Sequence, residues 1–417
     1  YWAVASVQQL VAAYTDATES YRMAIQYGRA ADNAVAEMMA VSGLAQMALE
    51  QGHLQRSFEI ATEAVQRIER AGVLPPISAL AYGVLAQIYY EWQELEQARR
   101  YGRRALELST LGGYNSGIAG CRAFLARLYQ LEADLEMATG EIQKAVDLVQ
   151  GEAPAYIRQE VVAQQVRVYL AQGRLAAAQI ALQGEGFSFQ DAFTFPELPD
   201  GARISHSSGL LYNSSLYLLL AEARAGGGAV NLAVGMPLAD WIIVAAREGR
   251  YRLVELEALL LRAQMHAERG SAAASAADYT AALALAAPEG FTGIFLDQGP
   301  RLAEALAQLR KQNKLERAQA EHADGILDAF ARLSLSGRPR EPEPATGAPP
   351  AALVEPLSER ELEVLNLMAV GLTYQEIAAR LFISLNTVRF HVKAIYGKLN
   401  VHKRGQAVES ARQLGIL

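Results

Sequence analysis

The sequence predicts an all-α protein, in which a long solenoid of paired helices is followed by a small helix-turn-helix domain. Three observations lead to this prediction. Residues of one type return at steps of about 40 in the first part of the chain. Apolar residues recur there at helical spacing, and a Pro- and Gly-rich stretch separates a basic C-terminal segment from the rest. A period near 40 residues with two helices per unit is typical of an α-solenoid.

Length and composition set the broad class. A chain of 417 residues suggests two or three domains, and with 51% hydrophobic residues it can bury a sizeable core. The single cysteine, Cys121, excludes an internal disulfide and a multi-cysteine metal site and fits the reducing cytosol. No apolar run reaches about 18 residues, so we expect a cytoplasmic protein without a membrane span. The chain begins at Tyr1 without a methionine, which suggests a fragment of a longer protein.

Charge is unevenly distributed along the chain. Residues 357–417 carry eight Lys and Arg against five Asp and Glu, a net charge of +3, which leaves −10 for the remainder. An acidic body with a basic end is common in DNA-binding regulators. A charge of +3 does not by itself decide whether the segment binds nucleic acid.

Four sets of small or apolar residues keep one register from residue 1 to about 185. In the first helix of each unit the small residues are Ala45, Ala86, Ala126 and Val166. The second helices open at Leu54, Leu95, Leu135 and Leu175, followed three residues later by Ser57, Ala98, Ala138 and Ala178. Deeper in the second helices stand Ala24, Ala64, Ala105 and Ala145. Small residues where two helices cross allow their axes to approach closely, so these sets predict helix pairs.

The repeating units resemble the tetratricopeptide repeat (TPR), with one departure. The usual TPR unit has 34 residues, and the longer period here indicates longer helices. The chain reverses at Gln51 and Gly52, and Gly173 and Gly270 stand at the same place in later units. We expect seven or eight helix pairs that form a sensor domain over residues 1–333, ending with an amphipathic helix near residues 316–333.

The repeat pattern breaks at residues 184–205, where four Phe, two Pro and three Gly predict a long loop. One interpretation is that the Phe side chains anchor this loop to the solenoid, and the other is that the loop faces a ligand. Several aromatic residues at helical spacing could stack on a sugar or could simply belong to the core. They are Tyr89, Tyr90, Trp92, Tyr129 and Tyr169.

Residues 334–356 predict an extended linker, and residues 357–417 predict four helices after it. Proline and glycine crowd the linker, which keeps such segments semi-rigid. The capping pair Ser358 and Glu361 starts a helix over 359–370, and Thr373 with Glu376 starts one over 374–382. A recognition helix over 384–400 and a fourth helix over 404–414 follow. Two short helices joined by a tight turn are the helix-turn-helix arrangement.

The helix predicted over residues 384–400 has one apolar and one basic face. Its apolar stripe consists of Val388, Val392, Ile395 and Leu399. Arg389 can pair bidentately with a guanine edge, and Lys393 lies one turn further on the same face. Backbone amides at the helix start, aided by Thr387, can bind a phosphate. This helix therefore suits a DNA major groove.

Residues 357–417 resemble the LuxR-type (GerE-like) DNA-binding domain over their whole length. The opening LSERE, the EIAARLFIS core, TVRFHV, KLNV and the closing LGIL stand where that family has them. The sequence departs from the family at Tyr374 and Gln375, where Asn-Lys is usual. This difference removes one positive charge near the DNA backbone.

The resemblance implies a role for each matching residue. Base edges are read by Arg389, Phe390 and Lys393. Phosphates are met by Thr373, Asn386, Thr387, Lys398, Lys403 and Arg404. Dimerisation falls to Val401, Ala407, Val408 and Ala411, although these four side chains could instead only cover the small core. For Phe390, contact with a thymine methyl and packing on the partner helix stay open. His391 is interpreted as a structural helix residue and Tyr396 as a packing or phosphate-side residue.

The solenoid and the basic domain together resemble the large MalT-like, ATP-dependent LuxR regulators. In these regulators an ATPase module precedes the helical-repeat sensor. No G-x-x-x-x-G-K-[ST] motif occurs here, so we expect no cofactor in this chain. If the analogy holds, ATP belongs to a module ahead of Tyr1.

The sequence therefore predicts a transcriptional regulator, with activation as the expected direction. Its expected partners are double-stranded promoter DNA, a second copy on paired half-sites, RNA polymerase, and an unknown small-molecule or protein effector at the solenoid. No carboxylate pair, G-x-S-x-G motif or His pair supports an enzyme or a metal site. The alternative function is a TPR-like protein-interaction scaffold with an accessory DNA-binding tail.

Overall fold

The computed structural model divides the chain into two compact units, residues 1–339 and 340–417. It describes residues 1–10, 14–71, 75–151, 153–189, 193–196, 204–227, 229–312 and 314–336 of the first unit. In the second unit it describes residues 359–370, 372–381, 388, 391–392, 395–396, 398, 401, 404, 407–408 and 411. In these described residues no helix is long and apolar enough to cross a membrane, and no three His, Cys, Asp or Glu side chains could together hold a metal ion.

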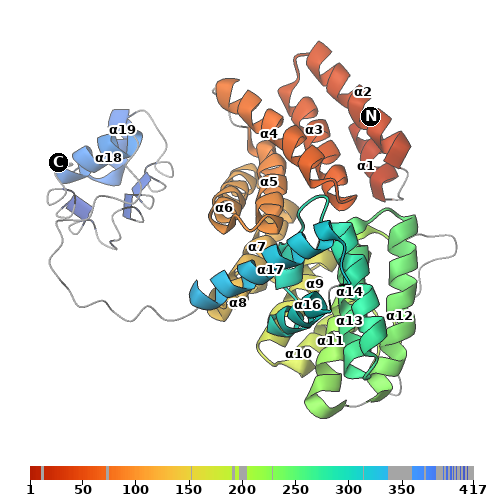
Figure 1. Ribbon diagram of the computed structural model, residues 1–417. Coiled ribbons are helices and arrows are strands. Elements are labelled where there is room, and N and C mark those ends of the chain that lie inside the picture. The colour runs from red at the N-terminus through yellow and green to blue at the C-terminus, as the bar shows by residue number, and fades with distance from the viewer. Residues whose placement is uncertain are drawn as a thin grey trace. The chain divides into compact units, whose positions relative to one another are not determined.

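The first unit consists of antiparallel helix pairs that stack side by side (Figure 1). Its first half contains α1 (Trp2–Leu10), α2 (Tyr14–Ala30), α3 (Ala34–Glu50), α4 (Leu54–Ala71), η1 (Pro76–Ser78), α5 (Ala79–Glu91), α6 (Leu95–Gly112), α7 (Asn115–Leu131) and α8 (Leu135–Val149). Its second half contains α9 (Ala155–Ala171), α10 (Leu175–Gln183), α11 (His206–Glu222), η2 (Ala223–Gly227), α12 (Ala229–Glu248), α13 (Arg252–Glu268), α14 (Ala272–Ala286), α15 (Gly293–Leu296), α16 (Pro300–Lys311) and α17 (Arg317–Ser336). The predicted all-α solenoid is confirmed.

The repeated residues form the buried seams between the helices. Ala45, Ala86, Ala126 and Val166 are fully buried, and so are Ser57, Ala98, Ala138 and Ala178. The one polar member of these sets is accommodated by a hydrogen bond, since the Ser57 hydroxyl donates to the Ala45 carbonyl over 2.7 Å. Small side chains at these positions allow close helix packing.

The predicted reversals between helices use the left-handed backbone region. Gly52, Gly173 and Gly270 have φ values of +81°, +71° and +74°. The next backbone amide then bonds back into the helix, as His53 N does to the Ala48 carbonyl over 2.8 Å. This geometry ends each first helix and starts its partner within three residues.

The Phe-rich insertion is anchored to the helices on which it lies. A short bridge pairs Ser188 with Thr194. Phe187 is buried beside Tyr212, and Phe195 stacks on Trp241 with ring centroids 6.0 Å apart. The interpretation of these Phe side chains as anchors is therefore confirmed for the described part of the insertion.

Residues 289–298, which we call the closing segment, connect the last repeats to the first ones. Thr292 N donates to the Glu91 carbonyl over 3.0 Å, and the Trp92 indole donates to the Glu289 carbonyl over 3.1 Å. The Glu289 side chain in turn accepts from Gln55 N at the start of α4. The closing segment thus ties α14 and α15 to α4 and α5, elements that lie some 200 residues earlier.

The second unit is a small helical domain with its own core. It contains α18 (Glu359–Ala369) and α19 (Tyr374–Leu381), and the further described residues from Val388 to Ala411, apart from Val401, are helical. Residues 334–336 belong to α17, so helix continues into the segment predicted as linker. The remainder of that predicted linker, residues 337–356, lies outside the described residues.

Candidate nucleic-acid interface and sensor interior

The core of the C-terminal domain is formed by the predicted apolar stripe. Val388, Val392 and Ile395 are buried against Val364 of α18 and Ile377 of α19. Spacings of four and three place these side chains on one side of a helix. The stripe therefore faces the first two helices, as a helix-turn-helix arrangement requires.

The start of α19 is fixed by the predicted capping box. The Glu376 carboxylate accepts from Thr373 N over 2.7 Å and from its hydroxyl over 2.8 Å, while Glu376 N approaches the Thr373 hydroxyl at 3.4 Å. The backbone hydrogen bond from Thr373 is the main reason that the pKa of Glu376 is lowered. This cap sets where the first helix of the helix-turn-helix begins.

Most of the residues expected to meet DNA lie outside the described residues. They are the base-reading Arg389, Phe390 and Lys393 and the phosphate-facing Asn386, Thr387 and Lys403. Their roles remain predictions.

Two residues expected at phosphates are instead engaged within the domain. The Lys398 ammonium lies 2.8 Å from the Glu361 carboxylate, and the two side chains are only 18% and 8% exposed. Arg404 donates to the Met368 carbonyl over 2.7 Å. Both contacts tie the later helices to α18, so a phosphate contact from either side chain has to compete with them.

Two of the four residues considered for a dimer surface lie in the core. Ala407 and Ala411 are fully buried, in one cluster with Val364 and Met368. Their burial favours the alternative interpretation, in which these side chains cover the small core. Val401 and Val408 are partly exposed, so self-association through them remains a prediction.

Two further contacts in this domain were not anticipated from the sequence. The Arg360 guanidinium donates to the Leu381 carbonyl over 2.8 Å and so links the start of α18 to the end of α19. The hydroxyls of Tyr374 and Tyr396 lie 3.4 Å apart, and burial together with this contact raises the pKa of Tyr396 to about 12. Tyr374, the departure from the family pattern, thus packs against the helix that carries Tyr396.

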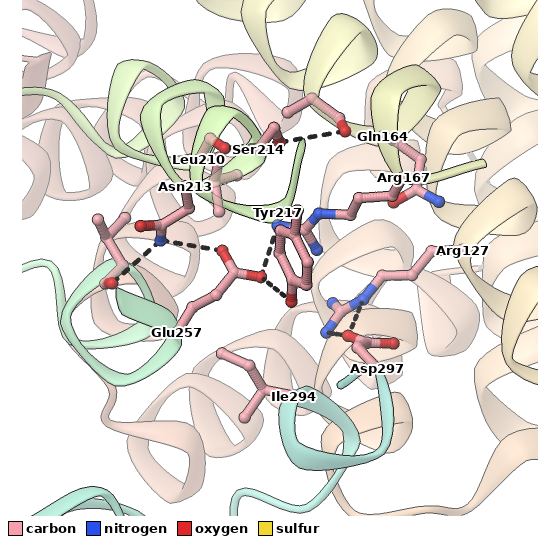
Figure 2. Close-up of polar contacts among 12 residues, drawn as sticks. Arg127, Gln164, Arg167, Leu210, Asn213, Ser214, Tyr217, Glu257, Ile294 and Asp297 are labelled. Carbon is pink, nitrogen blue, oxygen red and sulfur yellow. Dashed lines mark hydrogen bonds and ion pairs between the residues drawn. The ribbon is translucent and has the colours of Figure 1, made fainter. Parts of the chain in front are cut away.

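In the first unit, a buried ionic cluster lies where the closing segment meets α5 and α7, and Figure 2 shows its pair of Arg127 and Asp297. The Arg127 guanidinium donates to the Asp297 carboxylate over 2.6 Å and to Glu91 over 3.0 Å. Tyr90 hydrogen-bonds to Asp297, and its ring lies 4.2 Å from the guanidinium carbon. Burial opposes the charge on Arg127, yet Asp297, Tyr90 and Glu91 raise its pKa well above the ordinary value. Burial also raises the pKa of Glu91.

A second cluster lies between α9, α11 and α13 (Figure 2). Arg167 contacts the fully buried Glu257 at 2.6 Å, and Glu257 also accepts from Tyr217 over 3.1 Å and from Asn213 over 3.0 Å. Gln298 of the closing segment bonds to Tyr217 and so joins the two clusters. Two buried atoms, Arg167 Nε and Asn213 Oδ1, have no hydrogen-bond partner among the described residues.

A third group of titratable side chains also lies in the interior of the first unit. Burial and the charge of Glu50 raise the pKa of Glu160 to about 8. Burial lowers the pKa of His206, whose Nδ1 has no partner within the described part of the chain, and its ring lies 6.2 Å from that of Tyr251. Residues from α3, α9 and α11 therefore meet although they are far apart in sequence.

The aromatic residues considered for sugar stacking are engaged within the domain. Tyr90 belongs to the Arg127 cluster, Trp92 bonds to the closing segment, and Tyr89 packs between Phe58 and Tyr101. Tyr129 is buried, and Tyr169 lies under the Arg174 guanidinium. Their placement favours the interpretation as core residues.

Sequence reasoning did not find the ionic clusters. Arg127, Arg167 and Glu257 stand in helices that carry other polar residues as well, and a single sequence does not show which helices meet. The one signal that the sequence offers is a charged residue with an apolar residue on each side.

The fold and these sites define a class of protein, the helical-repeat regulators that carry a helix-turn-helix domain. Residues 1–312 match the family model described as the MalT-like TPR region, and residues 355–411 match the model for bacterial regulatory proteins of the luxR family. The chain belongs to the MalT-like TPR family, and its C-terminal domain is of the LuxR type.

Three similar proteins illustrate this relationship. The HTH-type transcriptional regulator MalT of Serratia proteamaculans is 26% identical over 88% of this chain and 39% of its own length. MalT of Klebsiella pneumoniae is 30% identical over 37% of this chain and 18% of its own length. A Rap protein complexed with Competence and Sporulation Factor shares the fold, with a TM-score of 0.52 and 11% identity over 80% of this chain and 84% of its own. The chain thus spans less than half the length of the MalT relatives that it matches.

Proposed function

We propose that this chain is the sensor and DNA-binding part of a transcriptional activator that works in the cytoplasm. The observation that carries this proposal is the burial of Val388, Val392 and Ile395 against α18 and α19. On a helix, positions 389 and 393 lie away from that stripe, so Arg389 and Lys393 are assigned to base edges and Phe390 to a neighbouring base. Two copies bind paired half-sites, and RNA polymerase is recruited there.

An effector acts on the first unit, at the interior cluster of Arg167 and Asn213. The support is the pair of buried polar atoms without a partner, because an unpartnered buried donor or acceptor is costly and is usually satisfied in native proteins. A small molecule with hydroxyl or amide groups satisfies both an amide oxygen and a guanidinium N–H. The concave face of a solenoid can bind peptides as well as small molecules, so a peptide is the second effector class to test.

DNA binding is tested with a duplex selected from a random-sequence library by the unaltered full chain. Arg389→Ala with Lys393→Ala is expected to abolish the preference for that duplex over scrambled DNA, measured by fluorescence anisotropy at low and high salt. Arg56→Ala with Arg70→Ala removes the same charge from the first unit and serves as the matched control. Unchanged sequence preference in the first double variant rejects the base-reading assignment.

Effector sensing is tested by thermal unfolding of the full chain against panels of sugars and peptides. A true effector raises the melting temperature by mass action, and Asn213→Ser is expected to reduce that rise. If no compound shifts the melting temperature while a stoichiometric protein partner does, the scaffold alternative is favoured instead.

A further inference from the structure

A cleft of about 700 Å³ opens where the turn between α3 and α4 faces the turn between α12 and α13. Gln51 and His53 form the first side, and three arginines from the second turn form the other. The floor is apolar and includes Leu259 of α13 and Leu285 of α14. The cleft therefore lies between early and late repeats of the first unit, away from the two ionic clusters.

The three arginines are Arg247 at the end of α12, Arg250 in the turn and Arg252 at the start of α13. The buried Glu255 carboxylate lies 2.9 Å from Arg247 Nε and 3.8 Å from an Arg252 Nη, which orients both guanidinium groups. The Arg247 side chain is still 64% exposed, so its terminal nitrogens stay accessible. Arg250 has no carboxylate within ion-pair distance among the described residues. Because Glu255 is the one acidic residue beside these three arginines, this side of the cleft carries a net positive charge.

One backbone feature adds to the positive charge on this side of the cleft. The first turn of α13 lines the cleft, and its cap residue Tyr251 supplies no side-chain hydrogen bond to the helix start. The first amides of a helix point towards an anion and carry the positive end of its dipole. At the neighbouring start of α4 a carboxylate of the chain already occupies the anion position, since Gln55 N donates to Glu289 over 3.0 Å.

The arginine wall also touches the opposite side of the cleft. A Cβ placed on Gly52 would lie 2.4 Å from Arg252 Cγ, so the stem of Arg252 rests directly on the turn between α3 and α4. A group bound by these arginines therefore holds early and late repeats together.

We propose that this cleft binds a small organic phosphate monoester, with the phosphate on Arg247, Arg250 and Arg252 and a short apolar body over Leu259 and Leu285. One guanidinium group can donate two hydrogen bonds to the oxygens of a phosphate. Three guanidinium groups match the double charge of a phosphate better than the single charge of a carboxylate. Binding stabilises the contact between early and late repeats. The proposal does not depend on DNA binding or on the interior effector site.

The test uses phenyl phosphate on the full chain, with benzoate, benzyl alcohol and inorganic phosphate as comparison probes in titration calorimetry. Phenyl phosphate is expected to bind, benzoate and inorganic phosphate more weakly, and benzyl alcohol not at all. If benzoate binds as tightly as phenyl phosphate, the phosphate assignment is overturned. If no probe binds, the site is overturned.

The variants Arg247→Gln and Arg250→Gly are each expected to weaken phenyl phosphate binding by about tenfold. Arg250 has a φ of +56°, a conformation that glycine adopts without strain, so Arg250→Gly removes the charge while keeping the turn. Arg56→Gln, an exposed arginine on α4, is the control and is expected to bind as the unaltered chain does. Equal affinity in Arg250→Gly and the unaltered chain overturns the proposal.

Discussion

The two units handle charge in different ways. The helical-repeat unit encloses ionic clusters in which each charge has several partners, as Arg127 has in Glu91, Asp297 and Tyr90. The described part of the C-terminal domain has one largely buried ion pair, Lys398 with Glu361. A charge with several buried partners cannot be removed without leaving others unpaired, whereas an isolated pair can be replaced as a unit. Networks of buried polar residues therefore determine how the repeats close, whereas the small domain combines an apolar core with single polar contacts between its helices.

The largest expected effect is in the repeat unit. Arg127→Leu leaves the carboxylates of Glu91 and Asp297 buried without their guanidinium, and we expect a loss of about 3–5 kcal/mol in the free energy of unfolding. Urea titration of the full chain, followed by circular dichroism, measures it. Arg56→Leu, on an exposed surface, is expected to change stability by less than about 0.5 kcal/mol. A similar small change in both variants would mean that the cluster does not hold the closing segment.

A smaller effect is expected in the C-terminal domain. Lys398→Met removes the ammonium group that contacts the buried Glu361 carboxylate, and it is expected to destabilise this domain by about 2–3 kcal/mol. Adding Glu361→Met is expected to restore most of that loss, because two apolar side chains can fill the same space. Urea titration of the chain in each variant provides the double-mutant cycle. If the double variant is no more stable than the single one, the contrast between the units is lost.

The interior of the repeat unit is also expected to respond to pH. Glu160 has a folded-state pKa of about 8, raised by burial and by the charge of Glu50, and Tyr156 lies nearby. Burial disfavours the charged form of Glu160 in the folded state, so its pKa is higher there than in the unfolded chain. The contribution of Glu160 to the free energy of unfolding is therefore full below about pH 4.5 and is lost as pH rises to about 8. Glu160→Gln is expected to flatten that decline and to stabilise the chain at pH 8 by about 1–2 kcal/mol.

Melting temperatures across this pH range check the prediction. Glu59→Gln, an exposed acid on α4, is the control and is expected to leave the pH profile unchanged. Parallel profiles for Glu160→Gln and the unaltered chain would contradict the assigned role of Glu160.

The smallest expected effect concerns the cap of α19. Thr373→Ala removes the hydroxyl of the capping box and is expected to destabilise the C-terminal domain by about 1 kcal/mol. Thr373→Ser keeps the hydroxyl and is expected to be close to neutral. The melting temperature of the C-terminal domain distinguishes the Thr373→Ala variant from the Thr373→Ser variant. Equal melting temperatures would show that the cap contributes nothing to stability.

Local patterns in the sequence were enough to predict the fold. The seams of Ala45 and Ser57, the turn at Gly52 and the cap at Thr373 are each set by residues within one repeat or one turn, so a single sequence displays them. The closing segment could not be predicted, because the link between Asp297 and Arg127 depends on how many repeats separate them and on the curvature that these repeats build up.

Residue type alone left alternatives open in the helices that follow α19. Ala407 and Ala411 are small and apolar at helical spacing, which suits a surface between two copies as well as a tight core. Lys398 is basic, which suits a phosphate as well as a carboxylate on a neighbouring helix. Only the position of α18 distinguishes these alternatives, and position is a tertiary property.

The closing segment also has a consequence for the order in which the chain is made. Asp297 follows Tyr90 by 207 residues, so the early repeats leave the ribosome long before their partner exists. At about 5–20 residues per second, Tyr90 and Arg127 wait roughly 10–40 s for it. During that interval their polar groups are accessible to water and to chaperones. The early repeats therefore have to fold into a form to which the closing segment can bind later.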